Sequence, residues 1–96
     1  MNIDPELDAL RRAIDDVDRR ILDLIAQRVK IVLQVGDFKR KRSLPIYDPE
    51  RERTMIEQLI QIAPHPLNPQ LVRRIFERLI DESRRIEQHH SEIPPG

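Results

Sequence analysis

Charged side chains occupy positions in this sequence where the surrounding apolar pattern calls for hydrophobic ones, and such positions are candidates for a binding or catalytic site. Steps of seven residues lead from Ile14 to Ile21 and then to Arg28. Lys39 follows eleven residues later, close to three full turns, so one helical face would carry both cations. Taken alone, Arg28 is more simply explained as a side chain that reaches water from an interface edge or pairs with a buried carboxylate.

Two later segments repeat this pattern with acidic and hydroxyl groups. Glu52 lies on an apolar helical face beside Arg51, and Asp48 is the expected N-cap of the same helix. Ser83 and Glu87 continue an apolar stripe near the end of a third helix. Individually, Glu52 is explained by the helix dipole, Asp48 by its role as a cap, and Ser83 and Glu87 by fraying of the helix end. Together with the cations of the first helix, they indicate a pocket for a small anion that carries one or two hydroxyl groups.

The sequence lacks candidates for covalent or metal catalysis. It contains no cysteine, and His65, His89 and His90 do not have the spacing of metal ligands. No Ser-His-Asp arrangement is available, and two glycines are too few for a Gly-rich phosphate loop. We therefore expect no metal and no cofactor, and a reaction that depends on binding and electrostatic stabilisation.

A first helix over residues 5–41 would position Arg28 and Lys39. No proline lies between Pro5 and Pro45, and apolar residues recur in this window at steps of three and four. Such a helix is roughly 50 Å long, whereas a compact chain of this size has a radius of gyration of about 13 Å. Because the apolar stripe continues to the far end, we predict an intertwined homodimer in which a second copy covers it.

Prolines delimit the remaining elements. Asp48-Pro49 and Asn68-Pro69 each combine an N-cap with a proline at the first helical position, which predicts helices over residues 49–63 and 69–89. Residues 91–96, ending in Pro-Pro-Gly, are expected to form a disordered tail. The chain is therefore predicted to be a single all-α domain of three helices, spanning residues 1–96.

Composition excludes several classes of partner. Lys and Arg number 17, as do Asp and Glu, and only 3% of residues are aromatic, which argues against nucleic-acid binding. No segment has the roughly 20 apolar residues that a membrane-spanning helix needs. The start of the sequence has no basic segment followed by an apolar run, so we expect no signal peptide and a cytoplasmic protein.

These residues resemble the all-helical, type II chorismate mutases over about residues 5–90. The resemblance is carried by Leu10-Arg11, the run from Asp18 to Leu24, Arg28, Val35-Gly36, Lys39, Pro45, Asp48, Arg51-Glu52-Arg53 and Glu82-Ser83. It implies a dimer of three-helix chains with two equivalent sites, and the Claisen rearrangement of chorismate, a small dianion, to prephenate. This reaction is unimolecular and pericyclic, so it requires no nucleophile.

The resemblance also implies roles for the cations. Arg11 and Arg28 bind the substrate carboxylates, and Arg11 enters each site from the partner chain. Lys39 clamps a carboxylate and donates a hydrogen bond to the ether oxygen. The helical geometry agrees with a contribution of Arg11 from the partner chain. Seventeen residues separate Arg11 from Arg28, which is about 25 Å along the helix, so the two arginines of one chain cannot easily share a pocket.

The same resemblance assigns the second and third helices. Glu52 and the backbone at Asp48 hold the ring hydroxyl, and Arg51 and Ser83 support the carboxylates. Glu87 departs from the many members that carry glutamine as second donor to the ether oxygen, although a fungal branch uses glutamate there and works best in acid. An ionised carboxylate cannot donate a hydrogen bond, so Glu87 is predicted to act in its protonated form.

Two other functions remain open from the sequence. An isochorismate–pyruvate lyase would share the fold, the arginines and a loop lysine, and would break the same ether bond. A non-catalytic dimerisation or regulatory module would leave the inward charges without a purpose, and such charges are costly to bury without a ligand. Docking on another shikimate-pathway enzyme is also left open.

Overall fold

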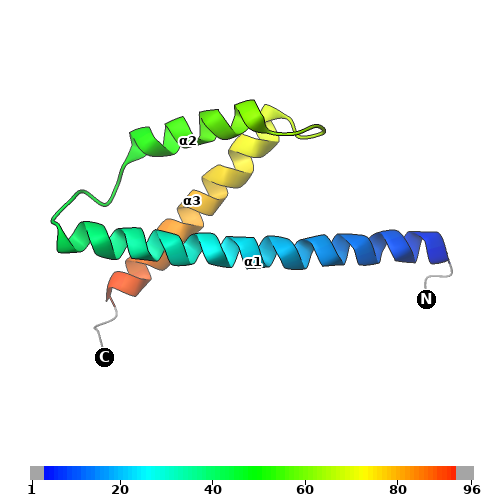
Figure 1. Ribbon diagram of the computed structural model, residues 1–96, viewed down its shortest axis with the longest axis horizontal. Coiled ribbons are helices and arrows are strands. Elements are labelled where there is room, and N and C mark those ends of the chain that lie inside the picture. The colour runs from blue at the N-terminus through cyan, green and yellow to red at the C-terminus, as the bar shows by residue number, and fades with distance from the viewer. Residues whose placement is uncertain (1–3, 93–96) are drawn as a thin grey trace. The chain divides into compact units, whose positions relative to one another are not determined.

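The computed structural model describes residues 4–92, and every regular element within that range is a helix. The helices are α1 (Pro5–Lys41), α2 (Pro49–Ile62) and α3 (Pro69–Glu92), drawn from blue to red in Figure 1. The prediction of an all-α chain with a very long first helix is confirmed. The third helix extends three residues beyond its predicted end, so Ser91 and Glu92 are helical, and the remainder of the predicted tail lies outside the described residues.

All three helices begin with the same two-residue signal. In each case Asp or Asn is the N-cap and proline takes the first helical position, where its missing N–H is not needed. The helix starts predicted at residues 49 and 69 are therefore confirmed. The cap side chains accept backbone hydrogen bonds, from Glu6 N to Asp4 Oδ1 (3.0 Å), from Arg51 N to Asp48 Oδ1 (3.1 Å) and from Leu71 N to Asn68 Oδ1 (2.9 Å).

The first helix ends in a Schellman motif with serine at the position that glycine usually takes. Ser43 has a φ of 55°, in the left-handed region. Leu44 N donates to Lys39 O at 2.8 Å, and Ser43 N donates to Arg40 O at 3.2 Å. These two bonds satisfy carbonyls of the last helical turn, and the chain leaves the helix axis at Ser43.

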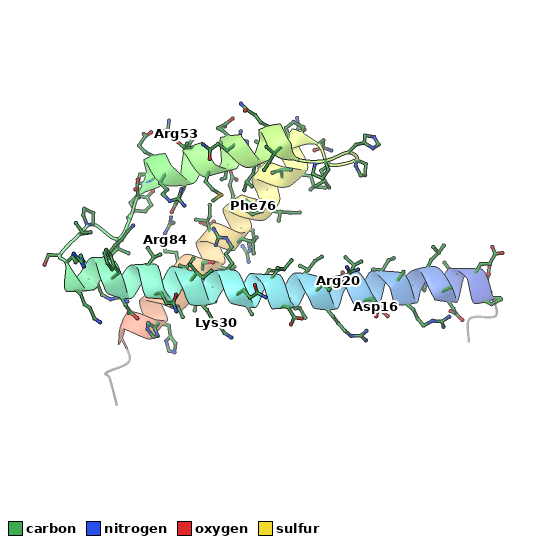
Figure 2. The ribbon with its side chains drawn as sticks, in the orientation of Figure 1. Asp16, Arg20, Lys30, Arg53, Phe76 and Arg84 are labelled. Atoms are coloured by element: carbon green, nitrogen blue, oxygen red, sulfur yellow. The ribbon has the colours of Figure 1, made fainter. Side chains whose placement is uncertain are left out.

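The chain divides into two compact units, which consist of residues up to Ile31 and of residues from Val32 onward. In the second unit α2 and α3 form a helical hairpin (Figure 1), whose contact buries Ile56 and Val72. Phe76 lies on α3 within this unit (Figure 2). Two exposed residues, Arg73 and Glu57, add an ion pair of 2.8 Å between the two helices. The hairpin therefore fixes α3 against α2.

The first unit consists of the N-terminal part of α1, and its apolar stripe is exposed. Leu10 and Leu24 expose 64% and 63% of their surface. A single helix cannot bury its own stripe, so this face requires another surface to cover it. The exposed apolar side chains of this part are Leu7, Leu10, Ile14, Val17, Ile21, Leu22, Leu24 and Ile31. Along residues 4–92, no helix is both long enough and apolar enough to cross a membrane.

Candidate active site

The predicted site residues are distributed over the two units. Arg11 is exposed and Arg28 is half-buried, and both belong to the first unit. Seventeen residues of helix separate them, which is a rise of about 25 Å. A small anion therefore cannot contact both arginines of one chain.

The second unit carries the remaining six predicted residues. Lys39 is half-buried, and its Nζ donates to the backbone oxygen of Ile46 at 3.3 Å. This bond ties the lysine to the loop that leads into α2. Asp48 caps α2 through its side chain, and Arg51 is exposed in the first turn. The end of α1, the loop and the start of α2 thus form one hydrogen-bonded segment.

Glu52 is held by an arginine that the sequence analysis did not identify. Arg84 of α3 extends toward the start of α2 (Figure 2) and donates from Nη2 to Glu52 Oε1 at 2.7 Å. Its guanidinium carbon also lies 4.7 Å from the centre of the Tyr47 ring, in cation–π geometry. One side chain of α3 therefore fixes both the carboxylate of Glu52 and the loop residue before the α2 cap.

The ion pair with Glu52 also acts on Arg84 itself. The hydrogen bond to this carboxylate raises the pKa of Arg84 above its ordinary value, so the guanidinium remains charged. Ser83, the preceding residue, is the buried polar residue of the hairpin, with only 4% of its surface exposed. A buried hydroxyl and a partly buried ion pair therefore lie at adjacent positions of α3.

Glu87 reaches from α3 toward α1. Only 14% of its side chain is exposed, and its Oε1 lies 4.0 Å from Nη1 of Arg40. Arg40 also donates to Asp37 at 2.6 Å, and His90 Nε2 lies 3.6 Å from the same carboxylate. The hydrogen bond from Arg40, together with the charge of His90, lowers the pKa of Asp37. Arg40 is therefore shared between the carboxylates of Asp37 and Glu87.

The structure thus brings some predicted residues into contact networks and leaves others apart. Within the second unit, Lys39, Glu52, Ser83 and Glu87 are all at least half-buried, whereas Asp48 and Arg51 are exposed. Arg84 and Arg40 were missed because each directly follows a predicted site residue and belongs to a charged run typical of a solvated helix face. Only the presence of an unpaired inward carboxylate on another helix could have pointed to them.

Comparison with known proteins identifies the family of the chain. The family model for chorismate mutase type II matches residues 10–88. The T-protein of Enterobacter agglomerans is 42% identical over 79 residues, which cover 81% of this chain but only 21% of that protein. The chain therefore spans about a fifth of the length of that relative. The chorismate mutase of Methanocaldococcus jannaschii is 30% identical over 88 residues, which cover 91% of this chain and 89% of that protein.

Solved structures give the same result for the fold. The crystal structure of Helicobacter pylori chorismate mutase in complex with prephenate matches with a TM-score of 0.84 and 28% identity, covering 94% of this chain and 99% of that one. Form II of the Thermus thermophilus chorismate mutase matches with a TM-score of 0.83 and 32% identity, covering 86% of this chain and 94% of that one. The family model, the relatives and the fold together show that the chain belongs to the type II chorismate mutase family.

Proposed function

We propose that this chain is a single chorismate mutase domain that converts chorismate to prephenate. The observation that carries the proposal is the set of polar side chains at least half-buried in the second unit: Lys39, Glu52, Ser83 and Glu87. A hydroxylated dianion has groups that match these side chains, since its carboxylates pair with a cation and its hydroxyl donates to a carboxylate. The relatives named chorismate mutase support the same substrate.

The chemistry requires positioning and charge, and no external reactant. The ether C–O bond of chorismate breaks while a C–C bond forms between its side chain and its ring, and no proton is transferred. The protein must hold the side chain folded over the ring and stabilise the negative charge that develops on the ether oxygen. Lys39 donates to this oxygen and clamps a carboxylate, and Glu87 is the second donor.

The other residues bind the periphery of the substrate. Arg28 and the Arg11 of a second copy pair with the two carboxylates, and Arg51 and Ser83 support them. Glu52 accepts the hydrogen bond of the ring hydroxyl, aided by the backbone at Asp48. Because Glu52 already pairs with Arg84, its carboxylate is oriented before the substrate binds.

The site is completed in a homodimer. Two observations support this assembly: the exposed apolar stripe of α1 and the separation of about 25 Å between Arg11 and Arg28. A second copy that packs along the stripe buries its leucines and isoleucines and carries its own Arg11 toward the site of the first chain. The cytoplasmic location stays a prediction, and the question of docking on another pathway enzyme stays open.

Product analysis tests the proposed function. The purified chain is incubated separately with chorismate and with isochorismate, and the products are identified chromatographically. We expect prephenate from chorismate and no release of pyruvate from isochorismate. Pyruvate from isochorismate without prephenate from chorismate would instead identify a lyase.

The protonated form of Glu87 is predicted to be the active one, so kcat should fall as the pH rises. Replacing Glu87 by Gln provides a donor at every pH, so the kcat profile of this variant should be flat between about pH 5 and 9. Identical profiles for wild type and Glu87→Gln would contradict the role of Glu87.

Arg84 is predicted to act on substrate binding through Glu52. Arg84→Gln should raise KM for chorismate by about tenfold and change kcat less, because the hydroxyl-binding carboxylate loses its charge-assisted hydrogen bond. Arg84→Lys, which keeps the charge, should recover most of the loss. The matched control is Arg85→Gln, since Arg85 is exposed and its ion pair within residues 4–92 is with Glu82 of the same helix. Equal KM values for Arg84→Gln and Arg85→Gln would exclude the positioning role.

A further inference from the structure

The one glycine within the described residues lies directly beneath the carboxyl group of Glu87. Gly36 is the buried residue of α1. A Cβ atom at this position would lie 3.0 Å from Cδ of Glu87 and 3.2 and 3.3 Å from its two carboxylate oxygens. All three distances are shorter than an ordinary van der Waals contact. Any side chain at residue 36 would therefore push against this carboxyl group.

The backbone gives no other reason for glycine at this position. Gly36 lies inside α1 and does not have a positive φ, so its conformation is open to any L-residue. Glycine is also among the poorest helix formers, and alanine at the same place would favour the helix. What the glycine provides is space for Glu87.

We propose that Gly36 is a positioning residue. Its lack of a side chain leaves a space against the α1 backbone, here called the seat, that holds the carboxyl group of Glu87. The inference rests on the proposed role of Glu87 as donor to the ether oxygen. Glu87 stretches from α3 to reach this seat, and Arg40, one turn beyond Gly36 on α1, lies 4.0 Å from the same carboxylate. The seat limits the carboxyl group to one location, and a donor must be held within about half an ångström of its productive position.

Gly36→Ala is expected to lower kcat about tenfold while the protein remains folded, because the new methyl group displaces the Glu87 carboxyl by a few tenths of an ångström. The urea midpoint should not fall, since alanine favours the helix and the displaced side chain is flexible. Gln34→Ala is the matched control, because Gln34 is an exposed residue of the same helix. It should leave kcat unchanged.

A double-mutant cycle separates an effect through Glu87 from a general effect on the helix. In the Glu87→Ala background the clash is absent, so adding Gly36→Ala should change the residual kcat by less than twofold. If the methyl group disturbed α1 itself, kcat would fall equally in both backgrounds, and that result would overturn the inference. Should Gly36→Ala alone fail to fold, a folded Gly36→Ala/Glu87→Ala double variant would support the seat, whereas two unfolded variants would refute it.

The controls distinguish failure of this inference from failure of the proposed function. A wild-type chain without chorismate turnover would contradict the proposed function. A Glu87→Ala variant with wild-type kcat would contradict the role of Glu87, and the seat with it. Loss of activity in Glu87→Ala with full activity in Gly36→Ala would contradict the seat alone.

Discussion

Replacing Lys39 by Ala is expected to lower kcat for chorismate by about 10²- to 10³-fold, because one preorganised donor to a developing oxyanion has an effect of this size. Lys39 is half-buried, and its Nζ is held at 3.3 Å from the Ile46 carbonyl oxygen. The Schellman motif fixes the helix backbone directly beneath it, since Leu44 N bonds to Lys39 O. These contacts orient the ammonium group in advance, and because it is the proposed donor to the ether oxygen, its loss is expected to affect the chemical step.

Steady-state kinetics of Lys39→Ala and Lys41→Ala test this prediction together. Lys41 is the last residue of α1 and is exposed, so its removal changes the local charge by the same amount without removing the proposed donor. Lys41→Ala should therefore retain kcat within about twofold. Equal losses in both variants would mean that Lys39 contributes only to the general positive potential at this end of the helix.

Mixing two inactive variants is expected to restore activity if each site combines two chains. In the proposed dimer, Arg11→Ala removes a carboxylate partner from the neighbouring site, and Lys39→Ala removes the proposed donor from its own site. In a mixed dimer one site receives both lesions and the other receives neither. Random pairing gives mixed dimers in half of the population, so about a quarter of the wild-type activity should return.

The mixing experiment uses co-refolding of the two variants from denaturant, with each variant refolded alone as the control. Recovery near a quarter supports a site that takes Arg11 from the second copy. If the mixture remains as inactive as its components while sedimentation confirms a dimer, Arg11 acts within its own chain or has no role in the site. A monomeric wild-type chain that is fully active would contradict the shared site altogether.

The sequence predicts the helices of this fold well because their limits are local. An Asx-Pro pair at each start fixes a cap and a φ angle without help from the rest of the chain. The apolar stripe predicts the long α1 because its period is regular. The end of α3 carries no comparable stop signal before the prolines at 94 and 95, and the predicted end at 89 was three residues too early.

The candidate site is only partly predictable from the sequence, because its contacts join residues of different helices. Periodicity identifies which residues face inward on one helix, and it indicated Glu52, Ser83 and Glu87. It cannot indicate which residue meets them from another helix. The pairs of Arg84 with Glu52 and of Arg40 with Glu87 depend on how α3 lies against the rest of its unit, as does the close approach of Glu87 to Gly36.

The rate of prephenate formation from chorismate by the purified chain tests the central claim most directly. Chorismate rearranges slowly without a catalyst, so the comparison with buffer gives the acceleration itself. We expect prephenate as the single product, at a rate proportional to the protein concentration and at least about a millionfold above the spontaneous rate per site. The rate should fall toward alkaline pH and nearly disappear in Lys39→Ala. Prephenate formation no faster than in buffer at any pH between about 4 and 9 would contradict the assignment.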